Sequence, residues 1–167
     1  MAQVLFKKSY LTIIENSAKG ENWMFRNFFL NKDGMELDVL QNGGLSCASL
    51  VSNILYMLNP ILEFVGKPHW LKYAHATVSS TEKDMVEHGW RVIEELKPGA
   101  VLIWEKRATG SGPHEHIGFC LSETEAVSND SNGTGFPWRH SLDYPSSVDK
   151  EPRKIEKIYW HQELENK

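Results

Sequence analysis

The sequence has few cysteines, no excess of basic residues and no long apolar run, and each shortage excludes a class of protein. Two cysteines are too few for a disulfide framework; Cys47 and Cys120 could form one bond, but we expect a reducing compartment. A net charge of −4 lacks the basic surplus typical of proteins that bind phosphate backbones, so we expect no nucleic-acid partner. No run reaches the ~18 apolar residues of a membrane span, and residues 1–20 show no signal peptide.

The hydrophobic residues that are present suffice for one core. They make up 41% of the 167 residues, and aromatic residues make up 11%. Domains commonly hold roughly 100–200 residues, and the chain contains no repeat, linker or low-complexity tract. The sequence therefore predicts a single domain over residues 1–167, and we expect a monomer.

The spacing of apolar residues changes once along the chain. Three- and four-residue spacing predicts helices at residues 9–20, 22–31 and 48–58, the last ended by Asn59-Pro60, and a short helix at 79–89. In that short helix Thr81 and Asp84 fit a capping box and Gly89 fits the C-terminal position. Alternation then predicts strands at residues 90–96, 99–106, 116–121, 125–130 and 154–161. Helices followed by antiparallel strands indicate an α+β fold.

Cys47 lies where a glycine-containing loop turns into the 48–58 helix. If Ser46 caps this helix, the thiol lies in the first turn, where unpaired N–H groups and the helix dipole favour an anion. Such a position lowers the pKa of a cysteine and makes the thiolate a nucleophile. Gly43 and Gly44 leave room for a substrate beside the sulfur. The alternative is that Cys47 is a small buried core residue.

His116 is the candidate base for this thiol. Alternation in the 116–121 strand puts His116, Gly118 and Cys120 on the face opposite the apolar core positions, and Gly118 keeps space open beside the imidazole. His114 ranks second because it precedes the strand. His114, His116 and Cys120 also resemble a metal-ligand cluster, but zinc-site spacing is absent, so we predict no metal and no cofactor. A satisfied structural histidine remains the alternative.

A third polar group should orient the base from the returning 125–130 strand. Ser128, Asn129 and Asp130 are the candidates, because residues on this strand lie beside His116. We favour Asn129, since an amide oxygen accepts the second imidazole N–H without holding the ring in its charged form. Asp130 replaces it if the register slips by one residue. The alternative is that this segment is simply a polar turn.

The order of these pieces resembles the NlpC-type and CHAP-type cysteine peptidases and amidases of the papain-like fold. The resemblance covers about residues 41–131: the cysteine at a helix start, the strand "LKPGAVLIWE", the "HIGF" strand and the return strand. It departs from the NlpC pattern around Ser46-Cys47-Ala48 and at the third residue, where that family often has histidine. In both respects the chain is closer to papain, which has a serine-cysteine pair and uses asparagine as the third residue. The papain motif also places a glutamine six residues before the cysteine, as Gln41 is here.

The resemblance implies a fold and an activity. It implies a helical layer whose cysteine helix packs on an antiparallel sheet, and a Cys47-His116-Asn129 triad with Gln41 in the oxyanion hole. The expected reaction is hydrolysis of an amide through a thioester, with a peptide or peptidoglycan fragment as substrate. The alternatives are another thiol acyl transfer, cleavage of an isopeptide bond, or a ligand-binding domain without activity.

The residues that would bind substrate lie elsewhere in the chain. Trp70, Trp104, Trp138 and His140 could wall a cleft, and residues 133–140 are expected to form a loop that reaches over it; core packing is the alternative for each tryptophan. The compartment stays open. A wall hydrolase without a signal peptide would act in the cytoplasm or leave by a non-classical route, as phage lysis and effector proteins do.

Overall fold

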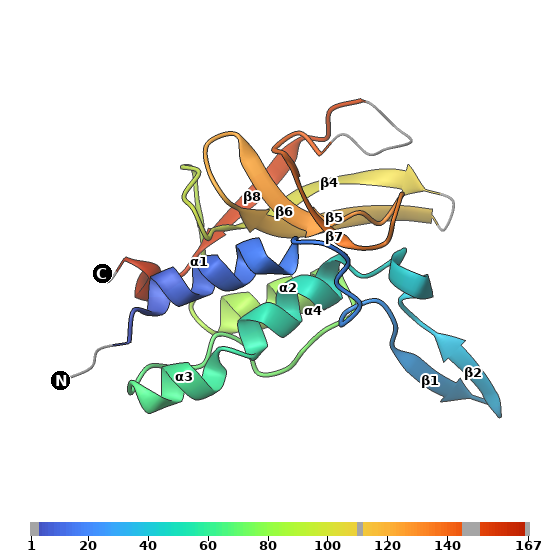
Figure 1. Cartoon of the computed structure of the whole chain (residues 1–167), viewed down its shortest axis with the longest axis horizontal. Helices are drawn as coiled ribbons and strands as arrows, with labels where there is room; N and C mark the ends of the chain where they lie inside the picture. Colours follow the sequence, from blue (N-terminus) through green and yellow to red (C-terminus); the bar gives the residue numbers. More distant parts are fainter. Residues whose placement is uncertain (1–3, 110–111, 145–150, 166–167) are drawn as a thin grey trace.

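The chain folds into an antiparallel sheet covered on one face by helices (Figure 1). A computed structural model describes residues 4–109, 112–144 and 151–165. The helices are α1 Phe6–Ser17, α2 Cys47–Tyr56, α3 Asn59–Phe64 and α4 Val78–Glu87, with short 3₁₀ turns η1 Gln41–Gly43 and η2 Gln162–Leu164. The strands are β1 Phe29–Lys32, β2 Met35–Asp38, β3 Arg91–Ile93, β4 Val101–Thr109, β5 Gly112–Cys120, β6 Glu125–Asn129, β7 Pro137–Ser141 and β8 Ile155–Trp160. The predicted α+β class is confirmed.

The main sheet has six strands in the order β3-β8-β4-β5-β6-β7, and every neighbouring pair is antiparallel. Consecutive strands β4 to β7 follow one another directly, because short turns suffice to join antiparallel neighbours. The C-terminal strand β8 inserts between β3 and β4. This insertion brings the segment just before β8 to the centre of the sheet, close to β4 and β5.

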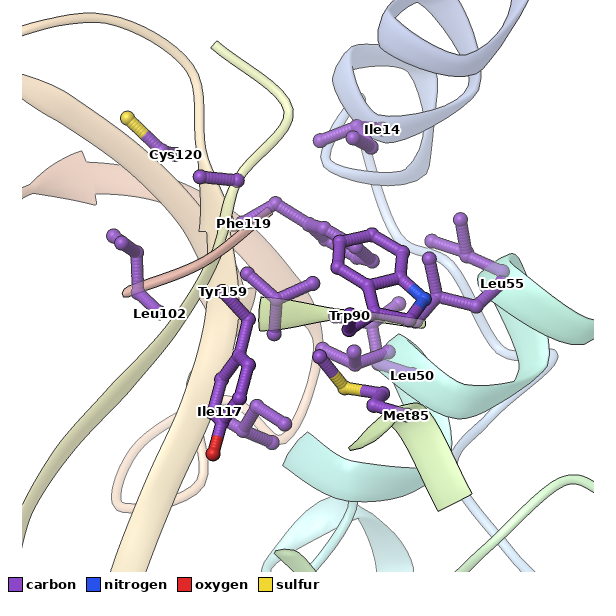
Figure 2. Close-up of a cluster of buried hydrophobic side chains, with 14 of the residues drawn as sticks. Ile14, Leu50, Leu55, Met85, Trp90, Leu102, Ile117, Phe119, Cys120 and Tyr159 are labelled. Carbon is purple, nitrogen blue, oxygen red and sulfur yellow. The ribbon is translucent and has the colours of Figure 1, made fainter. Parts of the chain in front are cut away.

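The core lies between the sheet and the helices (Figure 2). Helix α2 packs on β5 and β6, and its Leu50 and Leu55 are fully buried. On β5, Phe119 points toward the helices while Cys120 points to the other side of the sheet. The predicted alternation in this strand is thereby confirmed, and it leaves His116 on the face that the helices do not cover.

The predicted helix at residues 22–31 is wrong, because this part of the chain enters a β-hairpin. Strands β1 and β2 pair from Phe29↔Asp38 to Lys32↔Met35 and project from the body of the molecule (Figure 1). Asp33 and Gly34 both have positive φ, at 55° and 84°, as the two central residues of a tight hairpin turn require. The Asp-Gly pair is a strong hairpin signal, and it outweighs the helical spacing of the neighbouring aromatic residues.

Two further predictions need correction. The helix expected at 48–58 ends at Tyr56, and Asn59-Pro60 opens helix α3 instead of only ending α2, because proline is tolerated in a first helical turn. The loop expected at 133–140 contains strand β7, which pairs with β6 from Asn129↔Pro137 to Glu125↔Ser141. A proline is compatible with this strand because it stands at the first position of an edge strand.

Helix α4 is correctly predicted as a helix, but its cap is not the expected one. Thr77 Oγ1 accepts a hydrogen bond from the Ser80 N–H at 3.2 Å, so the helix begins one turn before Thr81. Gly89 follows the helix with a φ of 91°, in the predicted C-terminal position. Asp84 therefore does not cap the helix, and its carboxylate contacts the segment before α4 and His88 instead.

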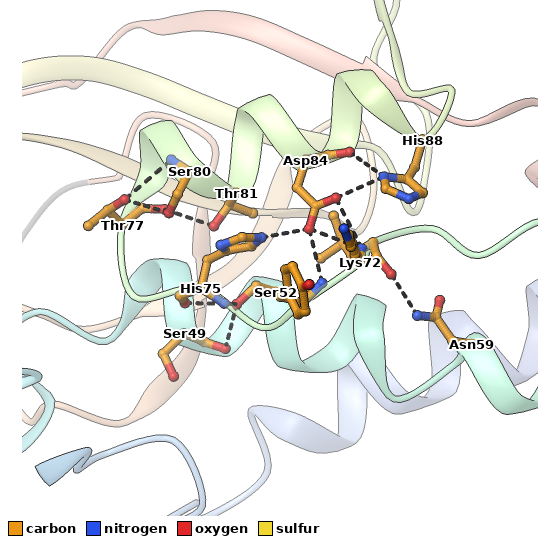
Figure 3. A network of polar contacts seen from close by, with 12 residues as sticks. Ser49, Ser52, Asn59, Lys72, His75, Thr77, Ser80, Thr81, Asp84 and His88 are labelled. Carbon is orange, nitrogen blue, oxygen red and sulfur yellow. Dashed lines mark hydrogen bonds and ion pairs between the residues drawn. The ribbon is translucent and has the colours of Figure 1, made fainter. Parts of the chain in front are cut away.

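Asp84 holds the segment before α4 in place (Figure 3). Its carboxylate accepts hydrogen bonds from the backbone N–H groups of Lys72 and Tyr73, and contacts His75 Nε2 at 2.6 Å and His88 Nδ1 at 2.8 Å. On the α2 side, Ser52 Oγ contacts both the N–H and the carbonyl oxygen of His75, at 2.8 and 2.9 Å. The segment that follows His75 is therefore anchored to α2 and α4 at once.

The stretch 47–64 has the length and composition of a membrane span, but it is mostly buried inside the structure. It is divided between α2 and α3, which begins at Asn59. Burial of this kind is typical of a core helix, so the stretch is weak evidence for a span.

We expect Asp84→Asn to lower the free energy of unfolding at pH 7 by about 1.5–3 kcal/mol, the range for hydrogen bonds to a charged group. Burial raises the pKa of Asp84, but the hydrogen bonds from His75, Lys72 and Tyr73 outweigh it and leave the pKa below its usual value. The carboxylate therefore contributes its full stabilisation at pH values above about 3.9, the pKa of Asp in the unfolded chain. This stabilisation is lost as the pH falls through the lower pKa of the folded state.

Urea unfolding of the wild type and Asp84→Asn from pH 7 downward measures this difference, which should shrink below about pH 3.9. The control is Asp33→Asn, the same change on the exposed hairpin turn, which should unfold at the same urea concentration as the wild type. Equal midpoints for Asp84→Asn and the wild type at pH 7 would contradict the assignment.

Candidate functional site

Cys47 is the first residue of α2 and lines a cavity of about 610 Å³. Its side chain is 9% exposed. Ser46 does not cap the helix as predicted: its buried hydroxyl makes no hydrogen bond within the described part of the chain, and the residue has helical φ and ψ. The chain enters the helix through the 3₁₀ turn η1, which does not provide the extended geometry that a serine cap requires.

His116 lines the same cavity from strand β5. The residue is 2% exposed, and its imidazole contacts two aromatic rings. Tyr144 stacks on it at a centroid distance of 4.0 Å, and Trp104, its partner in the β4–β5 register, is 5.5 Å away. The structure thus brings Cys47 and His116 together at one cavity, although no hydrogen bond joins them among the residues described. Catalytic hydrogen bonds often form only when substrate is bound.

Ser128, and not the favoured Asn129, contacts the imidazole. Ser128 Oγ lies 2.8 Å from His116 Nε2, because the β5–β6 register pairs Ser128 with Gly118 and puts it on the face of His116. Asn129 points the other way, and its Nδ2 donates to the Gly43 carbonyl oxygen at 2.7 Å. Asp130 lies beyond the end of β6, where its carboxylate accepts from the Thr134 N–H at 2.8 Å.

Gly118 makes the contact between Ser128 and His116 possible. A Cβ atom at Gly118 would lie 2.6 Å from the Cβ of Ser128 and 3.1 Å from the ring of Trp104. These distances are too short for any residue but glycine. The sequence predicted that Gly118 keeps space open beside the imidazole, and in the structure Ser128 and Trp104 occupy that space.

A second histidine continues this chain of hydrogen bonds. Ser128 Oγ lies 2.7 Å from His140 Nε2, and His140 Nδ1 lies 2.6 Å from the Ser141 carbonyl oxygen. A carbonyl oxygen only accepts hydrogen bonds, so His140 Nδ1 must carry a proton. Burial lowers the pKa of His140 to about 4, so the ring is neutral at pH 7 and its Nε2 is an acceptor.

The direction of every bond in the chain follows from that carbonyl. Ser128 donates its one proton to His140 Nε2, and its oxygen therefore accepts from His116 Nε2–H. A neutral His116 with a proton on Nε2 has an unprotonated Nδ1, and Nδ1 makes no hydrogen bond to the residues described. The arrangement thus prepares His116 Nδ1 to accept a proton at the cavity.

Gln41 also lines the cavity, in a loop that three contacts hold from different parts of the chain. The side chain of Asn42 accepts one hydrogen bond from Arg26, and its N–H donates to Asp38 at 2.7 Å, while Asn129 donates to the Gly43 carbonyl oxygen. Gln41 and Asn42 have positive φ values of 50° and 52°, which residues other than glycine rarely adopt. Such strained residues persist only where surrounding contacts hold them.

The residues predicted to bind substrate do not line the cavity. Trp104 is fully buried and its indole N–H donates to the Leu142 carbonyl oxygen at 2.6 Å. Trp138 and His140 lie on β7 behind Ser128, and Trp70 belongs to the core. Alternation places Trp104 on the His116 face, but the rings around His116 fill that space and leave no surface for a ligand.

Tyr144 and Arg153, which the sequence did not indicate as site residues, line the cavity beside Cys47 and His116. Tyr144 has a φ of 43° and its hydroxyl donates to the Asn129 carbonyl oxygen at 3.1 Å. Arg153 lies just before β8 and is 5% exposed. Neither residue belongs to a recognisable motif, and only the insertion of β8 into the sheet brings Arg153 here. Another part of the wall comes from the segment anchored by Asp84, with Ala76, Thr77, Val78 and Ser79.

The resting pair is uncharged, contrary to the predicted low pKa of the cysteine. Burial raises the pKa of Cys47 and outweighs the backbone N–H groups of Ile117 and Ala48 and the charge of Arg153, which lower it. Burial, with the charge of Arg153, lowers the pKa of His116 well below its usual value. The start of α2 is too deeply buried for the helix dipole to keep a thiolate there.

The described part of the chain contains neither a disulfide bond nor a metal-binding cluster. Cys47 and Cys120 are both free thiols, and Cys120 Sγ donates to the Ser122 carbonyl oxygen at 3.2 Å. Within residues 4–109, 112–144 and 151–165, no cluster of three His, Cys, Asp or Glu side chains is arranged to hold a metal ion.

Neither models of known protein families nor curated proteins match this chain. The cavity itself is therefore the basis for any functional conclusion.

We expect ¹⁵N NMR at pH 7 to show His116 as the Nε2–H tautomer and His140 as the Nδ1–H tautomer. In Ser128→Ala the acceptor for His116 Nε2–H is lost, and His116 should become a mixture of tautomers. His140→Gln assigns the second ring and serves as the comparison. A His116 ring protonated on Nδ1 in the wild type would contradict the hydrogen-bond directions derived above.

We also expect Cys47 to react with iodoacetamide with an apparent pKa above ~8.5, the value of an ordinary thiol. The measurement is the pH dependence of alkylation at Cys47 by peptide mass spectrometry in a Cys120→Ala background; burial raises the pKa of Cys120 to about 11. An apparent pKa well below ~8.5 that rises in His116→Ala would reveal a thiolate–imidazolium pair instead.

Proposed function

We propose that the protein is a cysteine hydrolase that cleaves an amide bond through a thioester at Cys47. The observation that carries this proposal is the prepared state of His116. Its Nδ1 is left without a proton by the hydrogen bonds that run from the Ser141 carbonyl oxygen, in a cavity that it shares with the only thiol there. A nucleophile, a base and a group that orients the base are the parts that covalent catalysis needs.

The reaction starts from the neutral pair. His116 Nδ1 takes the proton of Cys47 as Sγ attacks the carbonyl carbon of the amide, and a C–S bond forms. The proton then passes to the leaving nitrogen, the C–N bond breaks and the amine departs. Water gives a proton to His116 and attacks the thioester, which releases the acid and restores the thiol. Ser128 accepts from His116 Nε2–H throughout and, with Tyr144, keeps the ring in position.

Gln41 is the side-chain donor assigned to the oxyanion. It lines the cavity with Cys47, and the contacts of Asn42 and Gly43 hold its backbone in the left-handed region. Its amide and the Cys47 N–H would stabilise the negative oxygen of the tetrahedral intermediate, a contribution of ~10²–10³ in rate for one donor. Asn129 supports this role indirectly because it holds Gly43.

The fold supports a papain-like arrangement of the NlpC type. The cysteine begins a helix that packs on an antiparallel sheet, and the histidine stands on the strand against which that helix packs. From that resemblance the substrate is a peptide or a peptidoglycan fragment. The cavity volume of about 610 Å³ lies within the usual range for small-ligand sites, ~300–1,000 Å³.

A second candidate is a binding domain without activity. The observation that favours it is the burial that raises the pKa of Cys47, together with the lack of a hydrogen bond to His116. A domain of this kind would bind the same fragments and leave them intact. Turnover separates the two candidates.

The test is hydrolysis of a panel of peptidoglycan fragments and peptide amides, with detection of the thioester on the protein by intact mass. We expect Cys47→Ala to form no thioester and His116→Ala to lose ~10²–10⁴ in kcat/KM. Gln41→Glu keeps the shape but replaces the donor, and should lose ~10²–10³ in kcat. Cys120→Ala removes the other thiol and should keep full activity.

Equal turnover of the substrates by Cys47→Ala and by the wild type would contradict the proposal. Saturable binding of a fragment without any thioester or product would establish the binding domain instead. The isopeptide and acyl-transfer alternatives appear in the same assay as activity on peptide conjugates or as transfer to an added amine.

A further inference from the structure

Arg153 is a buried cation at the cavity wall, and its bonds are few. Nε donates to the Glu105 carbonyl oxygen at 2.7 Å and Nη2 donates to the His114 carbonyl oxygen. Glu105 lies within the segment where the β4–β5 register shifts, between Trp104 and Arg107, and His114 is the β5 residue that pairs with Arg107 at the end of that shift. Arg153 therefore joins the two strands beside the β-bulge.

These two bonds use one edge of the guanidinium group. Nε–H and one Nη2–H point to the carbonyls, while Nη1 and the second Nη2–H make no hydrogen bond to any residue in the described ranges. No carboxylate in the same ranges lies within ion-pair distance of Arg153. A structural role at the bulge explains the first edge and leaves the second unexplained.

Arg153, which carries this free Nη1–Nη2 edge, lines the cavity and is 5% exposed. Its guanidinium also lies over the ring of Tyr144, with Cζ 5.9 Å from the ring centroid, but no anion accompanies it among the residues described. A buried charge without an anion beside it is costly, because few water dipoles remain to solvate it. Arginine also stays protonated in such a place. The wall otherwise carries Lys106 and His114 as basic side chains and Glu115 as its acidic one, so the cavity is prepared for an anion.

The charge acts at the reacting pair as well. Arg153 is among the groups that lower the pKa of Cys47 and that of His116. Because Arg153, Cys47 and His116 line the same cavity, a group bound to Arg153 would lie in the cavity that holds the sulfur. Two parallel N–H groups on one guanidinium edge match the two oxygens of a carboxylate.

We infer that the free Nη1–Nη2 edge of Arg153 binds a carboxylate of the substrate, next to the bond that Cys47 attacks. This inference deepens the proposed function and depends on it only for calling the ligand a substrate. It makes Arg153 a specificity-determining residue: amides that carry a neighbouring carboxylate are accepted, and their carboxamide analogues are poor substrates.

The first test needs no turnover and compares two alkylating reagents at Cys47. Iodoacetate carries a carboxylate and iodoacetamide carries the carboxamide of nearly the same shape. In both reactions the same Cys47 thiolate attacks the CH₂ carbon of the reagent, a C–S bond forms and iodide leaves. The ratio of their rates therefore cancels any change in the pKa of Cys47. The reference ratio comes from the same cysteine peptide in the urea-unfolded protein.

We expect the iodoacetate-to-iodoacetamide ratio at Cys47 of the folded protein to exceed the reference by about tenfold or more, as hydrogen bonds to a charged group allow. Arg153→Gln should return the ratio to the reference, and Arg153→Lys, which keeps the charge but not the fork, should fall between them. Lys106→Gln removes another cation of the cavity wall and is the matched control, with an unchanged ratio.

Two results would overturn the inference. One is a ratio that is the same in the wild type and in Arg153→Gln. The other is an equal fall in Arg153→Gln and Lys106→Gln, because it shows a diffuse positive potential instead of a site at Arg153. Labelling of the buried Cys120 reveals whether Arg153→Gln is unfolded. In that case Arg153→Lys replaces it, and an iodoacetate-to-iodoacetamide ratio equal to that of the wild type, or a fall equal to that in Lys106→Gln, overturns the inference.

The second test uses matched peptide amides that differ only by a carboxylate or a carboxamide beside the scissile bond. We expect the wild type to prefer the carboxylate substrate and Arg153→Lys to show a smaller preference, because it loses more activity on the carboxylate substrate than on the carboxamide substrate. An equal loss on both substrates would assign Arg153 to the oxyanion and overturn carboxylate recognition. Failure of the hydrolase proposal is seen separately, as no turnover of either substrate with the alkylation preference intact.

Discussion

The hydroxyl of Ser128 is the contact on which the rest of the site depends. It lies between two imidazoles, 2.8 Å from His116 and 2.7 Å from His140, and has one proton to give. Because His140 is tied to a backbone carbonyl, that proton can go only to His140, and the state of His116 follows. A backbone group on the edge strand β7 thus determines which nitrogen of His116 is basic, through two side chains on neighbouring strands.

Burial sets the charge state of this site more strongly than the helix terminus does. Cys47 stands at the start of α2, but the low dielectric around it disfavours a thiolate, and the same effect disfavours an imidazolium at His116. A neutral pair is then the stable resting state, and charge appears only as the proposed reaction proceeds. Arg153 is the exception, because a guanidinium remains charged even when buried. It gives the cavity a fixed positive charge at the place where an anion would complete it.

The loop that carries Gln41 connects this site to the outer parts of the chain. Asp38 at the end of the β1–β2 hairpin and Arg26 before it both hold Asn42, while Asn129 holds Gly43 from the sheet. Gly43 also packs against Gly135, where any side chain would meet backbone atoms 2.3 Å away. The left-handed conformations of Gln41 and Asn42 cost roughly 1–3 kcal/mol each, so contacts from both sides are needed to keep them.

The amino-acid sequence by itself determined the local features: the α+β class, the start of α2 at Cys47, and the alternation that separates His116 from Ile117 and Phe119. These depend on periodicity over a few residues. The hairpin at residues 29–38 was missed because its aromatic residues also fit helical spacing, although Asp33-Gly34 carried the signal. Ser128 could not be chosen over Asn129 from the sequence, because one residue of register between β5 and β6 decides which side chain faces His116. Arg153 depends on still more distant pairing, the insertion of β8 beside β4 and the bulge in β4–β5. Only the tertiary structure places a cation there, since strand order and register are properties of the whole sheet and not of any one segment.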